Sequence, residues 1–172
     1  FEWNTANGDL LRRFSKHKAD VRCLCVAQGC LFSGSDDNTI QVHDMTSGSE
    51  SLATYKGHTA GVLALAHPSP ASVEIWSAGG DTEVFCWDIA TGSILRRLQG
   101  HTGPITAMMP LPVAGMVLTS SMDKTIRGWD ETGECVQRME HHQGYVSGLV
   151  HIAERQRREV ANRIWSFSGG DK

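Results

Sequence analysis

The sequence predicts an all-β fold built from four-stranded units that repeat along the chain. Three features recur about every 42 residues: a histidine, an aspartate further on, and an aromatic-acidic pair after that. The histidines are His17, His58, His101 and His142, and the aspartates are Asp37, Asp81, Asp123 and Asp171. The pairs or their variants are Trp3-Asn4, His43-Asp44, Trp87-Asp88 and Trp129-Asp130. A period of this length, with histidine at one end and Trp-Asp at the other, is typical of a four-stranded propeller blade.

Local composition predicts the strands one by one. Runs rich in apolar and β-branched residues, bounded by Gly, Pro, Ser or Asp, are expected to form strands over 62–67, 73–78, 83–88, 94–98 and 135–139. Residues 1–4 are read as the end of a third strand, and 10–14 as the outer strand after it. Only 153–162 has any helical character, and its charged residues leave no face that is apolar enough to bury.

Tight turns are expected between the second and third strands of each repeat. Asp37-Asn38, Asp81-Thr82 and Asp123-Lys124 stand at these points. An aspartate suits such a turn because its side chain accepts hydrogen bonds from the backbone just after it.

The repeats also share a longer motif. It reads SGSDDNTIQVHD over 33–44, SAGGDTEVFCWD over 77–88 and TSSMDKTIRGWD over 119–130. Gly-His precedes it at Gly57-His58 and Gly100-His101, whereas Lys16-His17 and His141-His142 keep only the histidine. These motifs resemble those of the WD-repeat β-propeller family over essentially the whole chain. The sequence departs from the family at His43, which replaces a tryptophan, and at Asn4, which replaces an aspartate.

The resemblance implies one propeller domain made of three full repeats with a partial repeat at each end. The preceding repeat ends at 1–16, the full repeats cover 17–57, 58–100 and 101–141, and a truncated repeat covers 142–172. Propellers close with about four to eight blades, so the chain is expected to be a fragment. The resemblance implies a complete ring of about seven blades.

In this family the recurring polar residues form a buried hydrogen-bonded tetrad in each blade. The residues that the resemblance assigns to these structural tetrads are His17, Ser33, Asp37, His43, His58, Ser77, Asp81, Trp87, His101, Thr119, Asp123, Trp129, His142 and Asp171. A His, an Asp and a Ser or Thr also match a hydrolase triad in composition. A triad is needed once per active site, however, whereas this set recurs in every full repeat, so a structural role is favoured and no catalytic residue is predicted.

Neither a metal nor a cofactor is expected. The Cys23-x-Cys25 spacing is one residue too short for a zinc pair, and His141 and His142 are adjacent. The Gly-rich stretches at 77–80 and 168–170 are not followed by Gly-Lys-Ser/Thr, so they do not form a phosphate loop.

The resemblance places a partner-binding rim at the narrow end of the propeller. The family's rim positions lie three and five residues after each repeat histidine and one residue before each turn aspartate. In this sequence they give Asp20, Arg22, Asp36, Leu63, Pro104, Thr106, Met122, Tyr145 and Ser147, together with Gly61, Gly80 and Gly170. The i, i+2 spacing of the first two positions predicts that both side chains share one strand face. Aromatic residues and Met beside polar ones are typical of a protein-binding surface.

Charge and cysteine content narrow the choice of partner and compartment. A net charge of −3 gives no reason to expect nucleic acid or an acidic membrane, and no apolar run is long enough for a membrane span. The five cysteines are read as reduced thiols in an intracellular setting, expected to be the cytoplasm, with the nucleus as the alternative. Cys23 and Cys25 are expected to share one strand face as small core residues.

The resemblance therefore implies a non-catalytic scaffold that binds partner proteins or peptides on the propeller surface within a multi-protein complex. The alternative is a targeting or substrate-recognition propeller of a larger enzyme, such as a ubiquitin-ligase substrate receptor or a signalling phosphatase or kinase, whose catalytic residues lie outside this chain. No small-molecule substrate is indicated. The fourth repeat carries an insertion at 153–162, which is expected to be a solvated basic loop on the opposite side, with a polar partner contact as the alternative.

Overall fold

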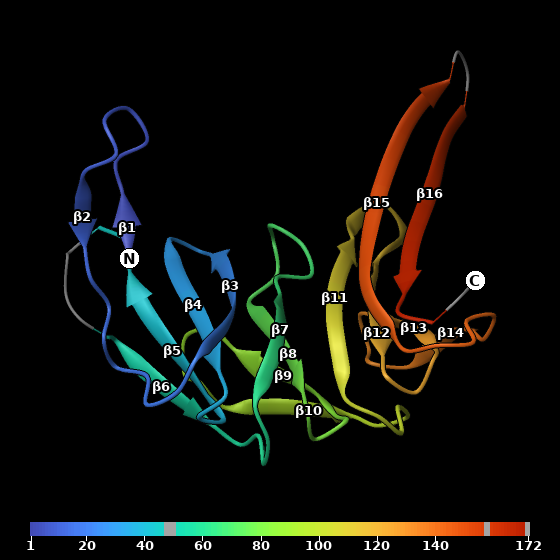
Figure 1. Cartoon of the computed structure of the whole chain (residues 1–172), viewed down its shortest axis with the longest axis horizontal. Helices are drawn as coiled ribbons and strands as arrows, with labels where there is room; N and C mark the ends of the chain where they lie inside the picture. The colour runs from blue at the N-terminus through green and yellow to red at the C-terminus, as the bar shows by residue number, and fades with distance from the viewer. Residues whose placement is uncertain (47–50, 157–158, 171–172) are drawn as a thin grey trace.

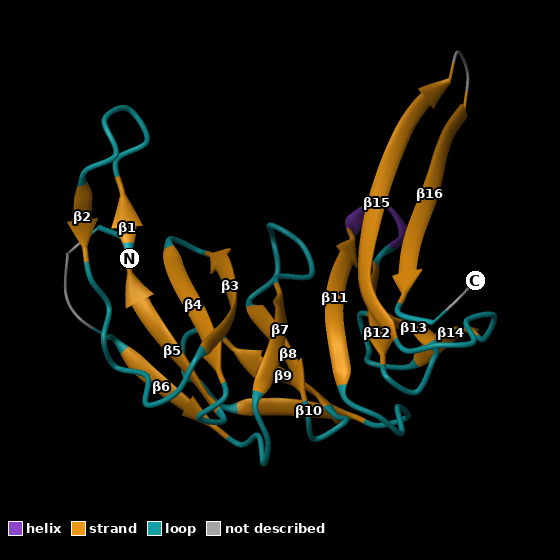
Figure 2. Ribbon diagram, in the orientation of Figure 1, coloured by secondary structure: helices purple, strands orange, loops and turns teal. Residues whose placement is uncertain are grey.

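The prediction of an all-β fold is confirmed. A computed structural model describes residues 1–46, 51–156 and 159–170, and of residues 152–162 only the backbone is described. Within these ranges the regular structure is β-strand, apart from one short 3-10 turn, η1 (Pro112–Ala114) (Figure 2).

Three four-stranded antiparallel sheets follow one another in the described part of the chain, and we call them blades 1 to 3. Blade 1 holds β3 (Val21–Ala27), β4 (Cys30–Ser35), β5 (Thr39–Asp44) and β6 (Ala53–Lys56). Blade 2 holds β7 (Val62–Ala66), β8 (Glu74–Gly79), β9 (Val84–Asp88) and β10 (Ile94–Leu98). Blade 3 holds β11 (Ile105–Leu111), β12 (Met116–Ser121), β13 (Ile126–Asp130) and β14 (Cys135–Met139). The strands expected from composition over 62–98 and 135–139 are therefore present, within one or two residues at each end.

Two-stranded sheets flank these blades. β1 (Glu2–Trp3) pairs with β2 (Leu10–Arg12) before blade 1. After blade 3, β15 (Val146–Gln156) pairs with β16 (Glu159–Ser168), and we call this second pair blade 4. The first strands contact one another in the order β3, β7, β11 and β15, so the blades form an arc with these strands along one common side (Figure 1).

The hydrophobic core lies between neighbouring blades. Phe32 and Ile40 of blade 1 pack in one cluster with Phe85 and Trp87 of blade 2. A second cluster joins blades 2 and 3 through side chains that include Trp76 and Trp129. Each sheet therefore buries its apolar face against the next one, as a stacked repeat protein must.

A polar contact recurs at each of three blade junctions. In every case a side chain of the outer strand donates a hydrogen bond to the carbonyl of the residue that follows the next aromatic-Asp pair. The bonds are Arg12 Nη2 to Met45 O (2.7 Å), Tyr55 Oη to Ile89 O (2.8 Å) and Arg96 Nη2 to Glu131 O (3.4 Å). These bonds link the outer edges of neighbouring blades.

The insertion of the fourth repeat is a β-hairpin instead of the expected loop. Strand pairing continues from Val146 and Ser168 outward to Gln156 and Glu159. The hairpin projects beyond the other blades (Figure 1). Its polar composition argued correctly against a helix, but a ladder of backbone hydrogen bonds needs no buried face. Arg155 lies within the ladder, whereas Arg157 and Arg158 lie outside the described residues.

Candidate functional site

The repeat histidine of blade 2 stands at the centre of a buried hydrogen-bond chain. His58 Nδ1 lies 2.7 Å from Asp81 Oδ2, and His58 Nε2 lies 2.6 Å from Ser77 Oγ. Trp87 Nε1 donates to the same serine oxygen at 2.7 Å. An ionised carboxylate can only accept, so His58 Nδ1 donates to Asp81. Nε2 of the neutral imidazole then accepts from the serine hydroxyl, whose oxygen accepts from the indole.

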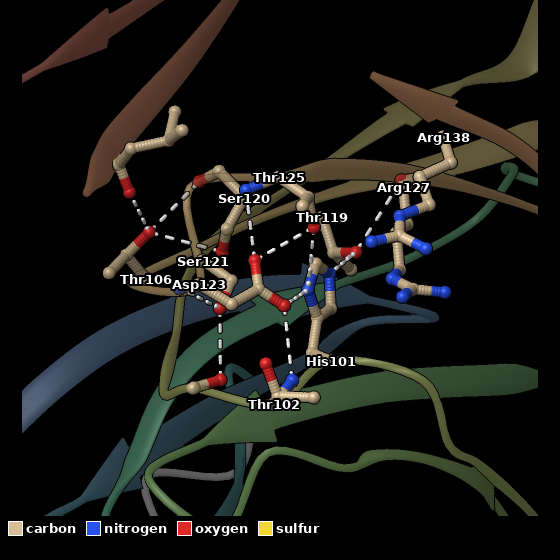
Figure 3. A network of polar contacts seen from close by, with 12 residues as sticks. His101, Thr102, Thr106, Thr119, Ser120, Ser121, Asp123, Thr125, Arg127 and Arg138 are labelled. Carbon is tan, nitrogen blue, oxygen red and sulfur yellow. Dashed lines mark hydrogen bonds and ion pairs between the residues drawn. The ribbon is translucent and has the colours of Figure 1, made fainter. Parts of the chain in front are cut away.

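Blade 3 repeats this chain with threonine in place of serine (Figure 3). His101 Nδ1 lies 2.7 Å from Asp123 Oδ2, and His101 Nε2 lies 2.7 Å from Thr119 Oγ1. Trp129 Nε1 donates to Thr119 Oγ1 at 2.8 Å. The backbone N–H of Thr102 also donates to Asp123 Oδ2, at 3.0 Å, which ties the loop before the blade to the turn inside it.

The turn aspartates are held in their ionised form. Burial of Asp123 opposes ionisation, but hydrogen bonds from Thr125 and His101 outweigh it and lower the pKa of Asp123 to about 2. Burial likewise disfavours the charged form of Asp37 and Asp81, and hydrogen bonds from their neighbours outweigh it, so both pKa values lie below the ordinary range. Burial also lowers the pKa of His101, even though Asp123 opposes that shift. The lowered pKa favours the neutral imidazole that the hydrogen-bond chain requires.

In blade 1 a histidine stands where blades 2 and 3 have tryptophan. His17 Nδ1 lies 2.9 Å from Asp37 Oδ2, and His17 Nε2 lies 2.9 Å from Ser33 Oγ. His43 Nε2 is 3.4 Å from the same oxygen, which is longer than either indole contact. The His43 ring is buried and packs against Phe14, with 4.7 Å between ring centroids. The smaller imidazole therefore occupies the tryptophan position but reaches the hydroxyl less closely.

Blade 4 contains a tetrad residue that the sequence reasoning missed. His142 Nε2 lies 2.7 Å from Ser166 Oγ. The strand pairing aligns Ser168 with Ser35 and Ser121, so that Gly170 stands at the position of the turn aspartates. Asp171 follows one residue later and lies outside the described residues. Aligning the second strands on the serine before the turn, rather than on the aspartate, would have identified Ser166.

The hydroxyls in these chains are enclosed. Ser77 and Thr119 are fully buried, and Ser33 is 4% exposed. A nucleophile has to reach its substrate, and these oxygens already form hydrogen bonds to an imidazole and an aromatic or imidazole N–H. The arrangement therefore matches a cross-link between loop, turn and strand.

A β-bulge recurs at the start of each first strand. The pairing register shifts between Val21 and Cys23, Val62 and Ala64, Ile105 and Ala107, and Val146 and Gly148. The residues skipped by the ladder are Arg22, Leu63, Thr106 and Ser147, which are the rim positions five residues after each repeat histidine. A bulge frees a side chain from regular alternation and redirects it, often beside a functional site.

A backbone hydrogen bond fixes the other two rim positions in every blade. Its donor is the residue before the turn aspartate or its equivalent, and its acceptor is the residue three after the repeat histidine. The bonds join Asp36 to Asp20, Gly80 to Gly61, Met122 to Pro104 and Gly169 to Tyr145, over 2.9 to 3.2 Å. In blade 4 the donor is Gly169 and not the expected Gly170. The acceptor residues stand just before the first strands, so the expected i, i+2 sharing of one regular strand face does not hold.

The rim positions converge on a cavity of about 450 Å³. Its lining consists of Val21, Arg22, Leu63, Thr106, Met122, Tyr145 and Ser147. Six of these seven are predicted rim residues, contributed by four blades, whereas Asp20, Asp36 and Pro104 do not line it. Met122 is 50% and Tyr145 47% exposed, so the cavity presents a large apolar and an aromatic side chain to solvent. Arg22 Nε lies 3.8 Å from Asp36 Oδ1 at its polar side.

Within the described part of the chain, the cysteines and the other histidines form no metal-binding group. Among the described residues no cluster of three His, Cys, Asp or Glu side chains is close enough to hold an ion. All five cysteines are free, and Cys23 and Cys25 share the face that packs against the first core cluster. Burial raises the pKa of Cys23 to about 12 and also raises that of Cys25, so neither thiol is activated. The described part of the chain contains no helix with the length and apolarity needed to cross a membrane.

Comparison with known sequences adds an independent finding. The sequence model of the WD domain, G-beta repeat, matches residues 8–44, 49–88 and 92–130, which is more than half of the chain.

Individual relatives cover most of this chain. Nuclear distribution protein nudF 1 of Talaromyces marneffei is 32% identical over 76% of the chain and 29% of its own length. An uncharacterized WD repeat-containing protein of Schizosaccharomyces pombe is 30% identical over 99% of the chain and 49% of its own length. COMPASS component SWD3 of Saccharomyces cerevisiae is 24% identical over 82% of the chain and 49% of its own length. The chain thus spans about half or less of the length of these relatives.

Proposed function

Because this chain belongs to the WD-repeat family, we propose that it is a non-catalytic interaction module that binds a protein or peptide partner at the rim cavity. The chain contributes β-propeller blades, and blades of this kind present a rigid surface on which loops and strand ends meet. The proposal assigns recognition to the rim and stability to the buried hydrogen-bond chains.

The observation that carries this proposal is the convergence of four blades on one opening. Equivalent bulges supply Arg22, Leu63, Thr106 and Ser147, and equivalent backbone bonds fix the loops around them. Met122 and Tyr145 add exposed apolar surface at the same opening. Buried aromatic and apolar anchors surrounded by polar groups carry most of the energy of typical protein interfaces.

The relatives support a role inside a multi-protein complex. Two of them are COMPASS component SWD3 and THO complex subunit 6, the latter from Arabidopsis thaliana. We infer for this chain a partner within such an assembly, inside the cell, where its five free cysteines stay reduced.

The test is a triple substitution of the rim anchors in the full-length protein. Leu63→Ala, Met122→Ala and Tyr145→Ala together should leave the protein folded, because Met122 and Tyr145 are exposed and Leu63 is only half-buried at the cavity, and such side chains contribute less to stability than core residues. We expect the triple variant to lose the main partner in a quantitative affinity pull-down. The matched control replaces Leu95, Val113 and Val136 with alanine, because they are exposed apolar residues away from the rim.

A different pattern of partner loss would contradict the rim assignment. If the rim variant retains every partner while neutralising Arg155, Arg157 and Arg158 removes one, the basic insertion is the working surface and the rim assignment is wrong.

A further inference from the structure

A second cavity lies between blades 2 and 3, at the other end of the strands from the rim. This inter-blade groove has a volume of about 440 Å³ and is enclosed by the β7–β8 loop, by η1 with the start of β12, and by the end of β13. Leu63 stands at the beginning of β7, whereas the groove is reached only after β7 ends. The groove and the rim cavity therefore face opposite ends of the propeller.

The charged side chains that line the groove are all acidic. Among its described lining residues these are Glu74, Asp130 and Glu131. Arg96, which adjoins the groove, donates to the Glu74 carboxylate and to the Glu131 carbonyl, so its charge is directed at Glu74. The Glu131 side chain is left to face solvent, and its Oε1 lies only 3.8 Å from the point where a Cβ on Gly115 would stand. Gly115 precedes β12, which pairs with β13, so this carboxylate lies on the blade 3 wall of the groove, opposite the β7–β8 loop of blade 2.

Asp130 adds a second fixed negative charge. Its Oδ1 accepts hydrogen bonds from the Thr132 hydroxyl (2.6 Å) and from the backbone N–H groups of Thr132 and Glu134 (both 2.9 Å). These bonds keep the pKa of Asp130 below its ordinary value, so the side chain is ionised at neutral pH. Asp130 and Glu131 are therefore two adjacent carboxylates at one wall, and within the described part of the chain neither forms an ion pair with a basic side chain.

Apolar surface lies beside this acidic wall. Val73 is 61% exposed on the β7–β8 loop, and Pro112 is exposed on η1. Both residues line the groove with the partly buried Met116. Asp130 recurs as Asp44 and Asp88 in the other blades, but the Glu131 charge is specific to this junction, because the equivalent residue is Ile89 in blade 2 and Met45 in blade 1.

We propose that the inter-blade groove binds an extended segment of a partner protein that places a Lys or Arg at Glu131 and Asp130 and an apolar side chain on Val73 and Pro112. The positive charge of the partner's Lys or Arg complements the carboxylates of Glu131 and Asp130. The apolar side chain next to it in the partner is buried against Val73 and Pro112. The site is distinct from the rim, so the protein is able to contact two partners, or two parts of one partner, at its two ends.

The experiment is a selection from a random peptide library displayed on phage, with the full-length protein as target. Selected peptides should share a Lys or Arg next to an apolar residue. A synthetic peptide from the selection should bind the Glu131→Lys variant about tenfold more weakly than the parent, and Glu131→Gln should weaken binding less. Replacing the peptide's arginine with uncharged citrulline, or its lysine with norleucine, should cause a comparable loss.

Two controls separate this site from other surfaces. Glu134→Lys makes the same charge change on an exposed neighbour that does not line the groove, and it should leave peptide binding unchanged. The Leu63, Met122 and Tyr145 rim variant should also bind the peptide normally. A selection that enriches no Glu131-dependent peptide, or peptides without a basic residue, overturns the proposal whether or not the rim is the working surface.

Discussion

At the scale of single residues, each buried hydrogen-bond chain runs in one direction from donor to acceptor. Trp87 donates to Ser77, Ser77 to His58, and His58 to Asp81, so the carboxylate is the final acceptor. Removing the acceptor leaves buried donors without a partner, which costs more than an ordinary exposed hydrogen bond contributes. The four residues are therefore expected to act as one unit.

Loss of the turn aspartate should destabilise the full-length protein. We expect Asp81→Ala and Asp123→Ala to lower the free energy of unfolding by about 2–4 kcal/mol, measured from urea midpoints. Asp81→Ala should cost less, because Asp81 Oδ1 is buried without a hydrogen-bond partner, whereas Asp123 Oδ1 accepts from Thr125. Asp36→Ala, at an exposed position, is the control and should change stability by less than about 0.5 kcal/mol.

The same residues fix how this stability depends on pH. The folded pKa of Asp123, about 2, lies below its reference value of 3.8, so its contribution is complete above the reference value and is lost as pH falls toward about 2. The pKa of His101 is lowered from 6.5, so protonation favours the unfolded chain and stability begins to fall below that pH. In Asp123→Ala the loss between about pH 4 and 2 should be smaller. If the parent and Asp123→Ala lose the same amount of stability between about pH 4 and 2, the proposed cross-link is ruled out. It is also ruled out if Asp81→Ala and Asp123→Ala are as stable as the parent.

The residues predicted for the tetrads of blades 1 to 3 lie in hydrogen-bond contact, and their even spacing in the sequence follows from short, regular strands. The exceptions have physical reasons. Ser166 was missed because the fourth repeat contains an extra residue between its serine and its aspartate. The longer contact of His43 to Ser33 follows from ring size and from Phe14, and no repeat pattern encodes the position of Phe14.

At the scale of elements, the turns between second and third strands require a left-handed residue after the aspartate. Asn38, Thr82 and Lys124 have φ angles of 66°, 68° and 72°. Asparagine tolerates this region well, whereas a β-branched residue is strained there. The sequence predicted the turns from their aspartates, but the positive φ depends on the turn type, which composition alone does not give.

Exchanging these residues between blades tests the turn geometry. Thr82→Asn should raise the free energy of unfolding of the full-length protein by about 0.5–1 kcal/mol, because it relieves the strained backbone. Asn38→Thr should lower stability by a similar or larger amount, since it also removes the hydrogen bond from Asn38 Nδ2 to Thr59 O. Denaturant midpoints measure both effects. A loss of stability in Thr82→Asn would show that backbone strain at Thr82 does not lower the stability of the protein.

The rim is likewise a product of element geometry. A regular strand would give two rim side chains per blade on one face, as the spacing suggested. The structure replaces this with a bulge at Arg22, Leu63, Thr106 and Ser147, and the register shift depends on pairing with the second strand. The positions were predictable from the family motif, whereas the mechanism that orients them was not.

At the scale of the whole molecule, the sequence predicts the blades better than their contacts. Each blade follows from local motifs, so the all-β architecture could be read from the period. The junction bonds from Arg12, Tyr55 and Arg96 use different side chains for the same task, so no repeat pattern reveals them. The β15–β16 hairpin also escaped prediction, because its outer part forms backbone pairs without an apolar signal.

The central claim is that a partner binds at the rim, and hydrogen–deuterium exchange of the full-length protein tests it most directly. Amide exchange is measured with and without the partner recovered in the pull-down. The account predicts slower exchange in the rim segments 20–22, 104–106 and 145–147 when the partner is bound, with the buried strands unchanged. Slower exchange confined to the hairpin at 152–162, with unaltered exchange in all three rim segments, would contradict it.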